Sequence, residues 1–454
     1  MNINKDINKI YFIGIGGISM SSLADIARVR GYHVAGYDRD STAIIDRLIS
    51  NGIKVNKTYN AENVEGFDLV VYSAAISDND PELLRAKELN IPCIKRSKFL
   101  GTIMFDYKNR IGVAGMHGKS TVTSIISNIY LQAELDPTIV NGSEMTEING
   151  AYKLGNYDNF IFEACEYTDS FLDFHPTTAV ILNVEMDHPD YFKDMNHIYD
   201  SFTKYINIAD KAVINADDAN IKHIIKDYAK PVITFGVNDN ADYKAVNITH
   251  EHGFAKFDVI YNNELLCSIS LSIPGSHNIY NALAGIAAAH QNGVDISGIV
   301  KGVETYKGAK RRFEFKHKYK GAYIYEDYAH HPTAIVPNLE SVKNMAFNKV
   351  WCVYQPHMYS RTAELYDDFL TAFDALDETD TLILVDIYAA RESNIYGVTS
   401  EQLSNSIAKT NGKDNTIYIS SFAETAEYLK KNISDGDIVL LMGAGDVNKI
   451  GDLI

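Results

Sequence analysis

One short stretch, "GVAGMHGKST" at residues 112–121, combines glycines with a lysine and two hydroxyl-bearing residues. Gly115 and Gly118 lack side chains, so successive backbone N–H groups around them can close on phosphate oxygens. The apolar-rich segment "TVTSIISNIYLQA" follows directly and predicts a helix whose N-terminus adds positive dipole charge. Lys119 would reach the terminal phosphates, and the Ser120 hydroxyl is placed to ligate Mg²⁺. The stretch therefore predicts a phosphate-binding loop.

This loop departs at its first position from the common phosphate-binding pattern G-x-x-x-x-G-K-[ST]. Val113 stands where the first glycine of that pattern would fall, so the match is to a shorter G-x-x-G-K-S-T form. A turn that contains Gly-Lys-Ser by chance is the alternative interpretation. Further phosphate- or metal-binding groups at neighbouring strand ends would decide between the two.

Such groups follow two later apolar runs, "NFIFEACEY" and "TAVILNVEMDH". Open parallel sheets bind ligands beyond the carboxyl ends of their strands, so Glu163, Glu166 and His188 are expected near the loop. A carboxylate there can ligate or orient Mg²⁺, and an imidazole can be a further ligand. Singly, a strand-end acid is usually a helix cap and an isolated histidine is usually structural. Their position on consecutive strands after a phosphate loop favours a metal site.

A second glycine-rich turn follows the first predicted strand, "IYFI". Gly14, Gly16 and Gly17 resemble a dinucleotide fingerprint, and Asp38 ends the next strand, where a ribose-binding acid would lie. Ser19 occupies the third glycine position, so the fingerprint is incomplete, and a tight turn without a ligand is the alternative. Any diphosphate-linked nucleoside could use this helix N-terminus, so the pattern does not specify NAD.

Three polar clusters lie in the last third of the chain: "KRRFEF" (310–315), "EDYAHHP" (326–332) and "QPHMYSRT" (355–362). Taken alone, the first two are more typical of a solvated basic loop and a turn ended by proline. The third adds His357 and Arg361 to the same region.

The composition narrows the class of protein. The chain has 454 residues and a net charge of −17, and it contains no basic stripe of the kind that binds a nucleic-acid backbone. Its four cysteines are far apart and form no C-x-x-C pair, which favours reduced thiols in a cytoplasmic protein. The apolar N-terminal run "IYFIGIGG" suits a strand and turn better than a signal peptide, and no stretch is long enough to span a membrane.

Length and element pattern together predict three consecutive α/β domains, since domains average about 150 residues. Residues 1–105 alternate strands and helices as a Rossmann-like domain. Residues 106–308 form a central domain like a P-loop ATPase, in which the alternating segment around residues 232–272 predicts added antiparallel strands. Residues 309–454 predict a second Rossmann-like domain with strands "AYIYEDYA", "KVWCVYQP", "TLILVDIYAA" and "DIVLLMGAG".

Motifs along nearly the whole chain resemble the Mur ligases of bacterial cell-wall synthesis, in the order found in that family. The matching segments are "FIGIGGISMSSLA", "SAAISDNDPEL", "GMHGKST", "NVEMDHPDYF", "GSHNIYNALA", "KGAKRRFEF", "DYAHHPTA", "QPHMYSRT" and "MGAGDVNKI". "DYAHHPT" with "QPHMYSRT" is specific to a branch that contains both alanine-adding and murein-tripeptide-recycling members. "EACEYTDSFL" is closer to the alanine-adding form, although Met116 and Cys165 replace the usual Thr and Asp.

The resemblance implies an activity and its substrates. The enzyme would join L-alanine to the lactoyl carboxylate of UDP-N-acetylmuramate through an acyl phosphate made from ATP, with Mg²⁺ as cofactor. It would act on these small molecules alone, in the cytoplasm, without nucleic acid or membrane, as a monomer or homodimer.

The resemblance also implies residue roles, with Lys119, Glu163, His188 and Arg312 as the catalytic set. Glu163 is preferred over Glu166 because its spacing from Lys119 matches the family. Metal binding falls to Ser120, Glu163 and His188. ATP binding falls to Gly115, Met116, His117, Gly118, Lys119, Ser120, Thr121, Asn278, Asn281, Arg312 and Asp327. UDP-sugar binding falls to Gly14, Gly16, Gly17, Asp38 and Ser73, and amino-acid binding to His330, His331 and Arg361.

Two rival functions fit parts of the sequence. An NAD-dependent dehydrogenase would use Gly14, Gly16 and Asp38 but leaves Lys119 and the strand-end acids unexplained. An ATP-gated switch would use the phosphate loop and hydrolyse ATP without an amino acid.

Overall fold

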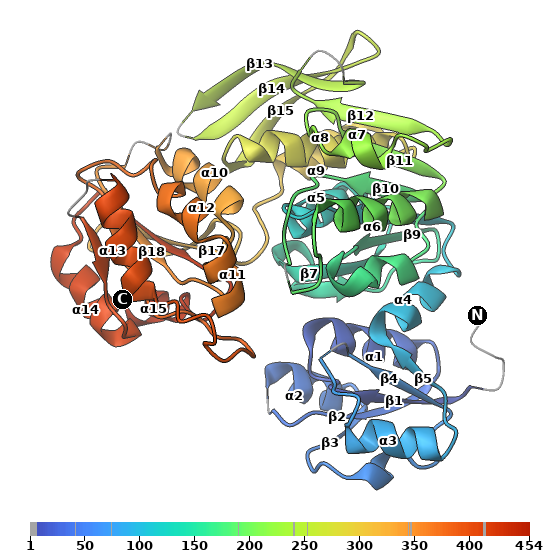
Figure 1. The fold of residues 1–454 in the computed structure, drawn as a ribbon. Coiled ribbons are helices and arrows are strands. Elements are labelled where there is room, and N and C mark those ends of the chain that lie inside the picture. Colours follow the sequence, from blue (N-terminus) through green and yellow to red (C-terminus); the bar gives the residue numbers. More distant parts are fainter. Residues whose placement is uncertain are drawn as a thin grey trace.

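The computed structural model describes residues 7–40, 42–73, 75–188, 190–238, 241–251, 253–343, 345, 347–411 and 415–454. Three sheets divide these residues, each in its own part of the chain (Figure 1). This arrangement confirms the predicted fold class of three consecutive α/β units, with parallel outer sheets and a mixed central sheet.

The first unit is a five-stranded parallel sheet in the order β3-β2-β1-β4-β5. Strand β1 is central, so the glycine turn that follows it lies between the two halves of the sheet, where ligands bind in such folds. Its elements are β1 (Lys9–Ile13), α1 (Ile18–Val29), β2 (His33–Tyr37), α2 (Ala43–Ser50), β3 (Lys54–Asn56), the 3₁₀ helix η1 (Ala61–Val64), β4 (Leu69–Tyr72), α3 (Pro81–Glu88), β5 (Cys93–Lys95) and α4 (Arg96–Met104).

The central unit has a ten-stranded sheet, β15-β14-β13-β12-β11-β10-β6-β9-β7-β8. Its first elements are β6 (Asn109–Ala114), α5 (Lys119–Gln132), β7 (Thr138–Met145), η2 (Thr146–Ile148), β8 (Gly150–Lys153), β9 (Asn159–Glu163), η3 (Tyr167–Asp173) and β10 (Thr178–Ile181). The rest are α6 (Met195–Ile208), β11 (Lys211–Asn215), α7 (Ile221–Ile224), β12 (Val232–Gly236), β13 (Tyr243–Glu251), β14 (Phe254–Tyr261), β15 (Glu264–Pro274), α8 (His277–His290) and α9 (Ile296–Glu304).

The antiparallel part of this sheet begins later than the sequence pattern predicts. β12 pairs in parallel with both β11 and β13, and only β13, β14 and β15 form an antiparallel meander, at the top of Figure 1. The prediction for residues 232–272 was therefore wrong for its first strand. β12 is fully part of the parallel sheet because it follows the α7 crossover from β11, and period-2 alternation does not report strand direction.

The last unit is a six-stranded sheet in the order β16-β17-β21-β18-β19-β20, parallel except for the β16–β17 hairpin. The sequence analysis did not assign β16 as a strand. The elements are β16 (Glu314–Tyr319), β17 (Ala322–Asp327), α10 (Pro332–Lys343), β18 (Val350–Tyr354), α11 (Tyr359–Glu364), α12 (Tyr366–Thr371), β19 (Thr381–Leu384), α13 (Ser400–Asn411), β20 (Thr416–Tyr418), α14 (Phe422–Asn432), β21 (Ile438–Met442) and α15 (Lys449–Leu453).

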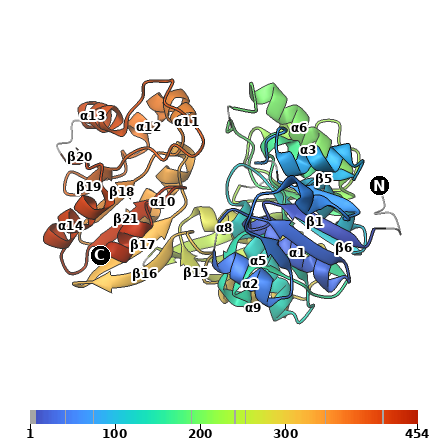
Figure 2. The same ribbon diagram turned by 90° about the horizontal axis from the view of Figure 1, so that it is seen from below.

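Different kinds of contact join the three units. A continuous apolar core runs from the first sheet through α4 to the α6 side of the central sheet. Polar contacts reinforce this junction, including the Ser97 hydroxyl donating to Asp173 and the Tyr152 hydroxyl donating to the buried Asp25. The last unit stands to one side, with α8 and α10 at the junction (Figure 2). The contacts that join it to the loops of the central sheet after β6 and β10 are polar.

The phosphate-loop helix α5 is fixed from behind by α8 and α9 in a second apolar core. Gly302 in α9 permits this approach, because a Cβ there would lie 2.3 Å from the Ile129 Cα of α5. We therefore expect Gly302→Ala to destabilise the chain by about 1–3 kcal/mol through overpacking. The measurement is thermal unfolding, with Ser297→Ala on the exposed side of α9 as a control expected to change stability little. An unchanged melting temperature for Gly302→Ala would contradict this packing.

Candidate active site

The loop between β6 and α5 has the backbone of an anion cradle. Gly115 and Gly118 take positive φ angles of 140° and 82°, which other residues rarely adopt. Gly118 is the N-cap of α5 and no side chain caps this end, so the first N–H groups of the helix stay available to an anion. His117, the histidine of the loop, is held in place by Asn183, because the backbone N–H of His117 donates to the Asn183 side-chain oxygen at 2.8 Å.

The charged end of Lys119 lies beneath this loop and is almost completely buried. Its Nζ donates to the carbonyls of Gly115 at 2.7 Å and Met116 at 3.1 Å, and to Glu166 Oε1 at 3.0 Å. Burial lowers the pKa of Lys119, but Glu166, with Cys165 and Glu163 nearby, raises the pKa by more in sum, so the lysine stays charged. A charged ammonium is thus held ready at the phosphate loop.

The two acids at the end of β9 face different partners. Glu163 accepts hydrogen bonds from the Ser120 hydroxyl at 2.7 Å and the Gly142 N–H at 3.0 Å. Glu166 is fully buried and faces Lys119 and, at 3.4 Å, the Nε2 atom of His188. Of the predicted metal-binding residues, the structure therefore brings Ser120 and Glu163 together and places His188 beside the other acid.

The Ser120–Glu163 pair fits Mg²⁺, which prefers oxygen ligands and usually keeps several waters beside one or two carboxylates and substrate phosphates. Throughout the described ranges, no three histidine, cysteine, aspartate or glutamate side chains are grouped as a ready-made metal site. A magnesium ion here would therefore depend on the nucleotide for part of its coordination.

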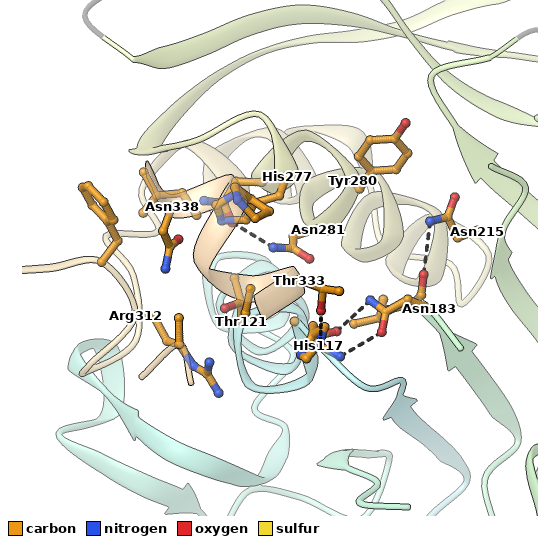
Figure 3. A pocket seen from close by; sticks show the side chains of 18 of the residues that line it. His117, Thr121, Asn183, Asn215, His277, Tyr280, Asn281, Arg312, Thr333 and Asn338 are labelled. Atoms are coloured by element: carbon orange, nitrogen blue, oxygen red, sulfur yellow. Dashed lines mark hydrogen bonds between the residues drawn. The ribbon is translucent and has the colours of Figure 1, made fainter. Parts of the chain in front are cut away.

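A cavity of about 420 Å³ opens beside the loop, between the central sheet and the last unit (Figure 3). Four features surround it: the phosphate loop, the N-terminal turn of α8, the start of the last unit, and α10. The predicted ATP-binding residues that line it are His117, Gly118, Thr121, Asn278, Asn281, Arg312 and Asp327. The remaining predicted ones, Gly115, Met116, Lys119 and Ser120, belong to the same loop.

The predicted asparagines and aspartate of this cavity also have structural contacts. The Asn278 amide donates to the Pro274 carbonyl, and Asn281 donates to Asn278 while packing on Gly118. Both Asp327 oxygens accept backbone N–H groups, from Phe313 and Ala329. These contacts shape the cavity wall. The guanidinium of Arg312 lines the same cavity and brings positive charge to it.

Sequence reasoning missed several residues that line the same cavity. Asn183 follows β10, Asn215 ends β11, and Tyr280 lies in α8 (Figure 3). The Tyr280 hydroxyl donates to Asp217, which also lines the cavity, at 3.0 Å. The available signal was the polar ending of β11, "INADD", which repeats the pattern seen after β9 and β10.

Two polar contacts connect the loops of the central sheet to the last unit. The first joins His117 Nε2 to Thr333 Oγ1 at 2.8 Å and to Glu185 at 2.8 Å, and Thr333 also contacts His331 Nδ1. In the second, Arg361 Nη2 donates to Asp187 Oδ1 at 3.1 Å, and both side chains are buried. Burial raises the pKa of Asp187, but the nearby His188, Arg361, His331 and His330 in sum lower the pKa well below its usual range.

The predicted amino-acid-binding residues are divided between these two contacts. His330 lies with its ring 5.5 Å from that of His357, whose Nδ1 is 3.2 Å from Arg361 Nη1. His331 instead lies against His117, with its own Nε2 lacking a partner among the described atoms. His357, which the sequence analysis placed in a cluster without assigning it a role, therefore joins Arg361 and His330.

The glycine turn of the first unit is closed by Asp38. Its carboxylate accepts from the Gly16 N–H at 2.8 Å and the Asp40 N–H at 3.1 Å, and a Cβ on Gly16 would collide with it. Gly14 takes a positive φ of 78° and Gly17 is the N-cap of α1, without a side-chain cap. Ser73 follows β4, where its Oγ accepts from the Ala75 N–H. The predicted UDP-binding residues thus occupy the strand ends of the first sheet.

Arg96, which the sequence analysis did not single out, connects this turn to the central unit. Its guanidinium donates to Ser19 Oγ at 2.8 Å. Burial lowers the pKa of Arg96, an effect that the nearby Cys165 and Glu163 partly offset. Arg96 thus links the first turn of α1, directly after the glycine turn, to the surroundings of Glu163.

Comparison with known proteins agrees with this arrangement. The Mur ligase family, catalytic domain, matches residues 9–108; the Mur ligase middle domain matches 113–289; and the Mur ligase, glutamate ligase domain, matches 311–445. The chain belongs to the Mur ligase family.

Several members of the family resemble the chain over its full length. A UDP-N-acetylmuramate–L-alanine ligase of Clostridium tetani is 46% identical over 99% of this chain and 98% of its own. One from Acetivibrio thermocellus is 46% identical over 98% of this chain and 95% of its own. The crystal structure of a UDP-N-acetylmuramate–alanine ligase from Thermotoga maritima superposes with a TM-score of 0.81 at 26% identity, covering 98% of this chain and 97% of that one. A murein peptide ligase of Psychrobacter arcticus shares the fold, with a TM-score of 0.71 at 22% identity, covering 98% of each chain.

The buried Arg361–Asp187 pair generates a prediction about attachment of the last unit. Asp187→Asn leaves the Arg361 guanidinium buried without its counter-charge, and breaking such a pair costs about 3–5 kcal/mol. We expect the ligand-free variant to expose α11 more often, so that amide hydrogen exchange there accelerates at least about tenfold. Amides of β1 are the internal control and should keep their exchange rates. Unchanged exchange in α11 would show that the pair does not hold the last unit in place.

Proposed function

We propose that the chain is an ATP-dependent ligase that joins L-alanine to the lactoyl carboxylate of UDP-N-acetylmuramate through an acyl phosphate, in peptidoglycan precursor synthesis. One observation carries the proposal: the phosphate loop with its charged Lys119 opens into a cavity that the last unit closes, beside the buried Arg361. The names of full-length relatives at 43–46% identity support the same activity.

ATP would occupy the cavity with its phosphates at the loop. Gly115 and Gly118 supply bare backbone N–H groups, and Lys119 and Arg312 supply positive charge for the phosphoryl group in transfer. The volume of about 420 Å³ falls in the usual range for small-molecule sites. Asn278 and Asn281 would face the adenosine.

Ser120 and Glu163 would hold magnesium, with His188 as a further ligand. The metal supplies Lewis-acid charge that offsets the negative charge on the transferring oxygens. The chain contributes the fixed position of its oxygens, because the Gly142 N–H and the Ser120 hydroxyl orient the Glu163 carboxylate.

The sugar nucleotide would bind at the glycine turn of the first sheet. Gly14, Gly16 and Gly17 bring the uncapped N-terminus of α1 to the diphosphate, where backbone N–H groups and helix dipole attract anions. Asp38 supports this site by holding the turn through the Gly16 N–H. Arg96 adds positive charge between this turn and Glu163.

L-Alanine would bind between the central loops and the last unit. Arg361 is the natural partner for its carboxylate, and at present Asp187 fills that role. Burial lowers the pKa of His330, and burial lowers the pKa of His331 to about 4. Both histidines are therefore neutral at pH 7 and leave the recognition of the carboxylate to the arginine.

The reaction follows from these placements in two steps. The lactoyl carboxylate attacks the γ-phosphorus of ATP, and the bond from this phosphorus to the bridging oxygen breaks. ADP departs, and the lactoyl group is now an acyl phosphate. The alanine amine then attacks the acyl carbon, phosphate departs, and the amine loses a proton as the amide forms. Alignment of three substrates on three units and exclusion of water supply the rate enhancement.

None of the described helices is long and apolar enough to cross a membrane. All four cysteines are free thiols, which agrees with action in a reducing cytoplasm. We place the enzyme there, acting on dissolved small molecules.

Removal of the Lys119 charge tests the phosphate loop. We expect Lys119→Ala to lower ligation by about 100- to 1,000-fold, because one transition-state charge contact contributes roughly 3–4 kcal/mol. The measurement is the rate of product formation, with Lys256→Ala at an exposed position of strand β14 as a lysine-to-alanine control. Ligation by Lys119→Ala at near the wild-type rate would rule out this loop as the ATP site.

Substrate dependence tests the ligase proposal against its rivals. We expect phosphate release from ATP to require UDP-N-acetylmuramate and to rise strongly with L-alanine, because the γ-phosphate needs an acceptor carboxylate and the acyl phosphate needs an amine. Arg361→Ala should raise the alanine concentration needed for half-maximal rate far more than the ATP concentration. Arg85→Ala on the exposed face of α3 is the matched control.

Three outcomes would contradict this function. Full-rate phosphate release from ATP alone would favour an ATP-gated switch. Efficient replacement of alanine by a murein tripeptide would favour the recycling activity of the same branch. NADH oxidation or formation, seen at 340 nm, would favour a dehydrogenase.

A further inference from the structure

Glu166 is a buried charge to which the ligase chemistry described above assigns no role. Its side chain is 0% exposed, and it precedes the 3₁₀ helix η3 directly. Thr168 and Asp169 in η3 take left-handed φ angles of 54° and 57°, which kink η3 at this point. The chain therefore adopts an uncommon backbone conformation immediately after this carboxylate.

The Glu166 carboxylate faces two functional side chains at once. Both of its oxygens lie 3.0 Å from Lys119 Nζ, and Oε1 also lies 3.4 Å from His188 Nε2. Oε2 has no aligned hydrogen bond among the described atoms. Glu163, three residues earlier, instead accepts hydrogen bonds from the Ser120 hydroxyl and the Gly142 N–H. The two acids thus have separate tasks.

For Lys119, Glu166 is the anionic partner among its hydrogen bonds. The other two N–H groups donate to the neutral carbonyls of Gly115 and Met116. An ammonium held only by carbonyls in a buried site would lose the Coulombic stabilisation that offsets its desolvation. Glu166 thereby supplies the counter-charge that holds the ammonium beneath the loop before any phosphate arrives.

For His188, the same carboxylate fixes which ring nitrogen carries hydrogen. Nε2 faces an anionic oxygen, so Nε2 bears the proton and Nδ1 keeps the lone pair of the neutral ring. A carboxylate that orients a metal-binding histidine in this way usually lies outside the metal's own ligand shell. The ligand-competent nitrogen of His188 is then Nδ1.

We propose that Glu166 is a positioning residue of the ligase reaction, whose single buried carboxylate sets both the Lys119 ammonium and the tautomer of His188. The inference rests on the proposed function, in which Lys119 serves the ATP phosphates and His188 serves magnesium. In this proposal, Glu166 couples phosphate binding at Lys119 to metal binding at His188.

The experiment compares the full-length wild-type chain with Glu166→Gln, which keeps the shape and removes the charge. In ligand-free protein labelled with ¹⁵N-histidine, we expect the wild-type His188 signal, assigned by its loss in His188→Gln, to show the Nε2–H tautomer. The glutamine variant should show a mixture of both tautomers. Binding of Mn²⁺ to the ATP-loaded chain, followed by electron paramagnetic resonance, should weaken by about 10- to 100-fold.

Kinetics separate positioning from a general loss of stability. We expect kcat of Glu166→Gln to fall by about 10- to 100-fold while the alanine KM changes less than threefold. Asp437→Asn is the matched control: it converts another buried carboxylate, bonded to Trp351 and Ser434 at the opposite end of β21, and should preserve both Mn²⁺ binding and kcat. If Glu166→Gln does not fold, Glu166→Asp retains the charge with a shorter reach and should show an intermediate loss of Mn²⁺ affinity.

If Glu166→Gln kept the His188 tautomer, the Mn²⁺ affinity and the kcat of the wild-type chain, the assignment of Glu166 would be overturned. An equal loss in Asp437→Asn would do the same, because it would show a general effect of neutralising a buried acid. Failure of the proposed function is distinguishable, since it would appear in the wild-type chain as an absence of alanine-dependent phosphate release.

Discussion

The buried ammonium of Lys119 is the constraint around which the central unit is organised. A charge removed from water costs several kcal/mol unless an opposite charge and hydrogen bonds surround it. The partner, Glu166, comes from the segment after β9, and His188 comes from the segment after β10. Both strands are immediate neighbours of β6 in the sheet.

This strand order has a consequence for the chemistry. With β9 on one side of β6 and β10 on the other, the strand ends deliver acids and histidine from two directions onto one phosphate loop. The loop itself uses backbone N–H groups, which carry no net charge, so the charge balance of the site is set by its neighbours. A change of strand order would remove Glu166, the counter-charge of Lys119, and Glu163, the partner of Ser120, together.

The last unit is attached to the same edge of the sheet. His117 of the phosphate loop contacts Thr333, and Asp187, directly before His188, pairs with Arg361. Both contacts therefore involve segments that would meet nucleotide or metal in the proposed reaction. In the proposed reaction, a ligand bound at the loop would therefore lie next to the side chains that hold the last unit in place.

Much of this arrangement was predictable from sequence because strands and loops follow local rules. Apolar runs ending in polar residues located β9 and β10 and their strand-end acids, and glycine with lysine located the phosphate loop. Sequence could not decide the direction of β12, since alternation is the same in parallel and antiparallel strands. Residue types alone could not separate Glu163 from Glu166, and only the family resemblance preferred Glu163, because the contact of Glu166 with Lys119 joins residues 47 positions apart. Arg96 was missed because its partner, Ser19, lies 77 positions away.

The histidines of the site show how its positive charge is controlled. Burial lowers the pKa of His277, His331 and His357 to about 4, and burial also lowers the pKa of His330. These rings are neutral at pH 7, so they can pack against one another and against Arg361 without repulsion. Lysine and arginine are positive charges of the site whose protonation does not change near neutral pH. In the proposed reaction, anionic phosphates and carboxylates would meet these cations, and the four neutral rings would shape the space between them.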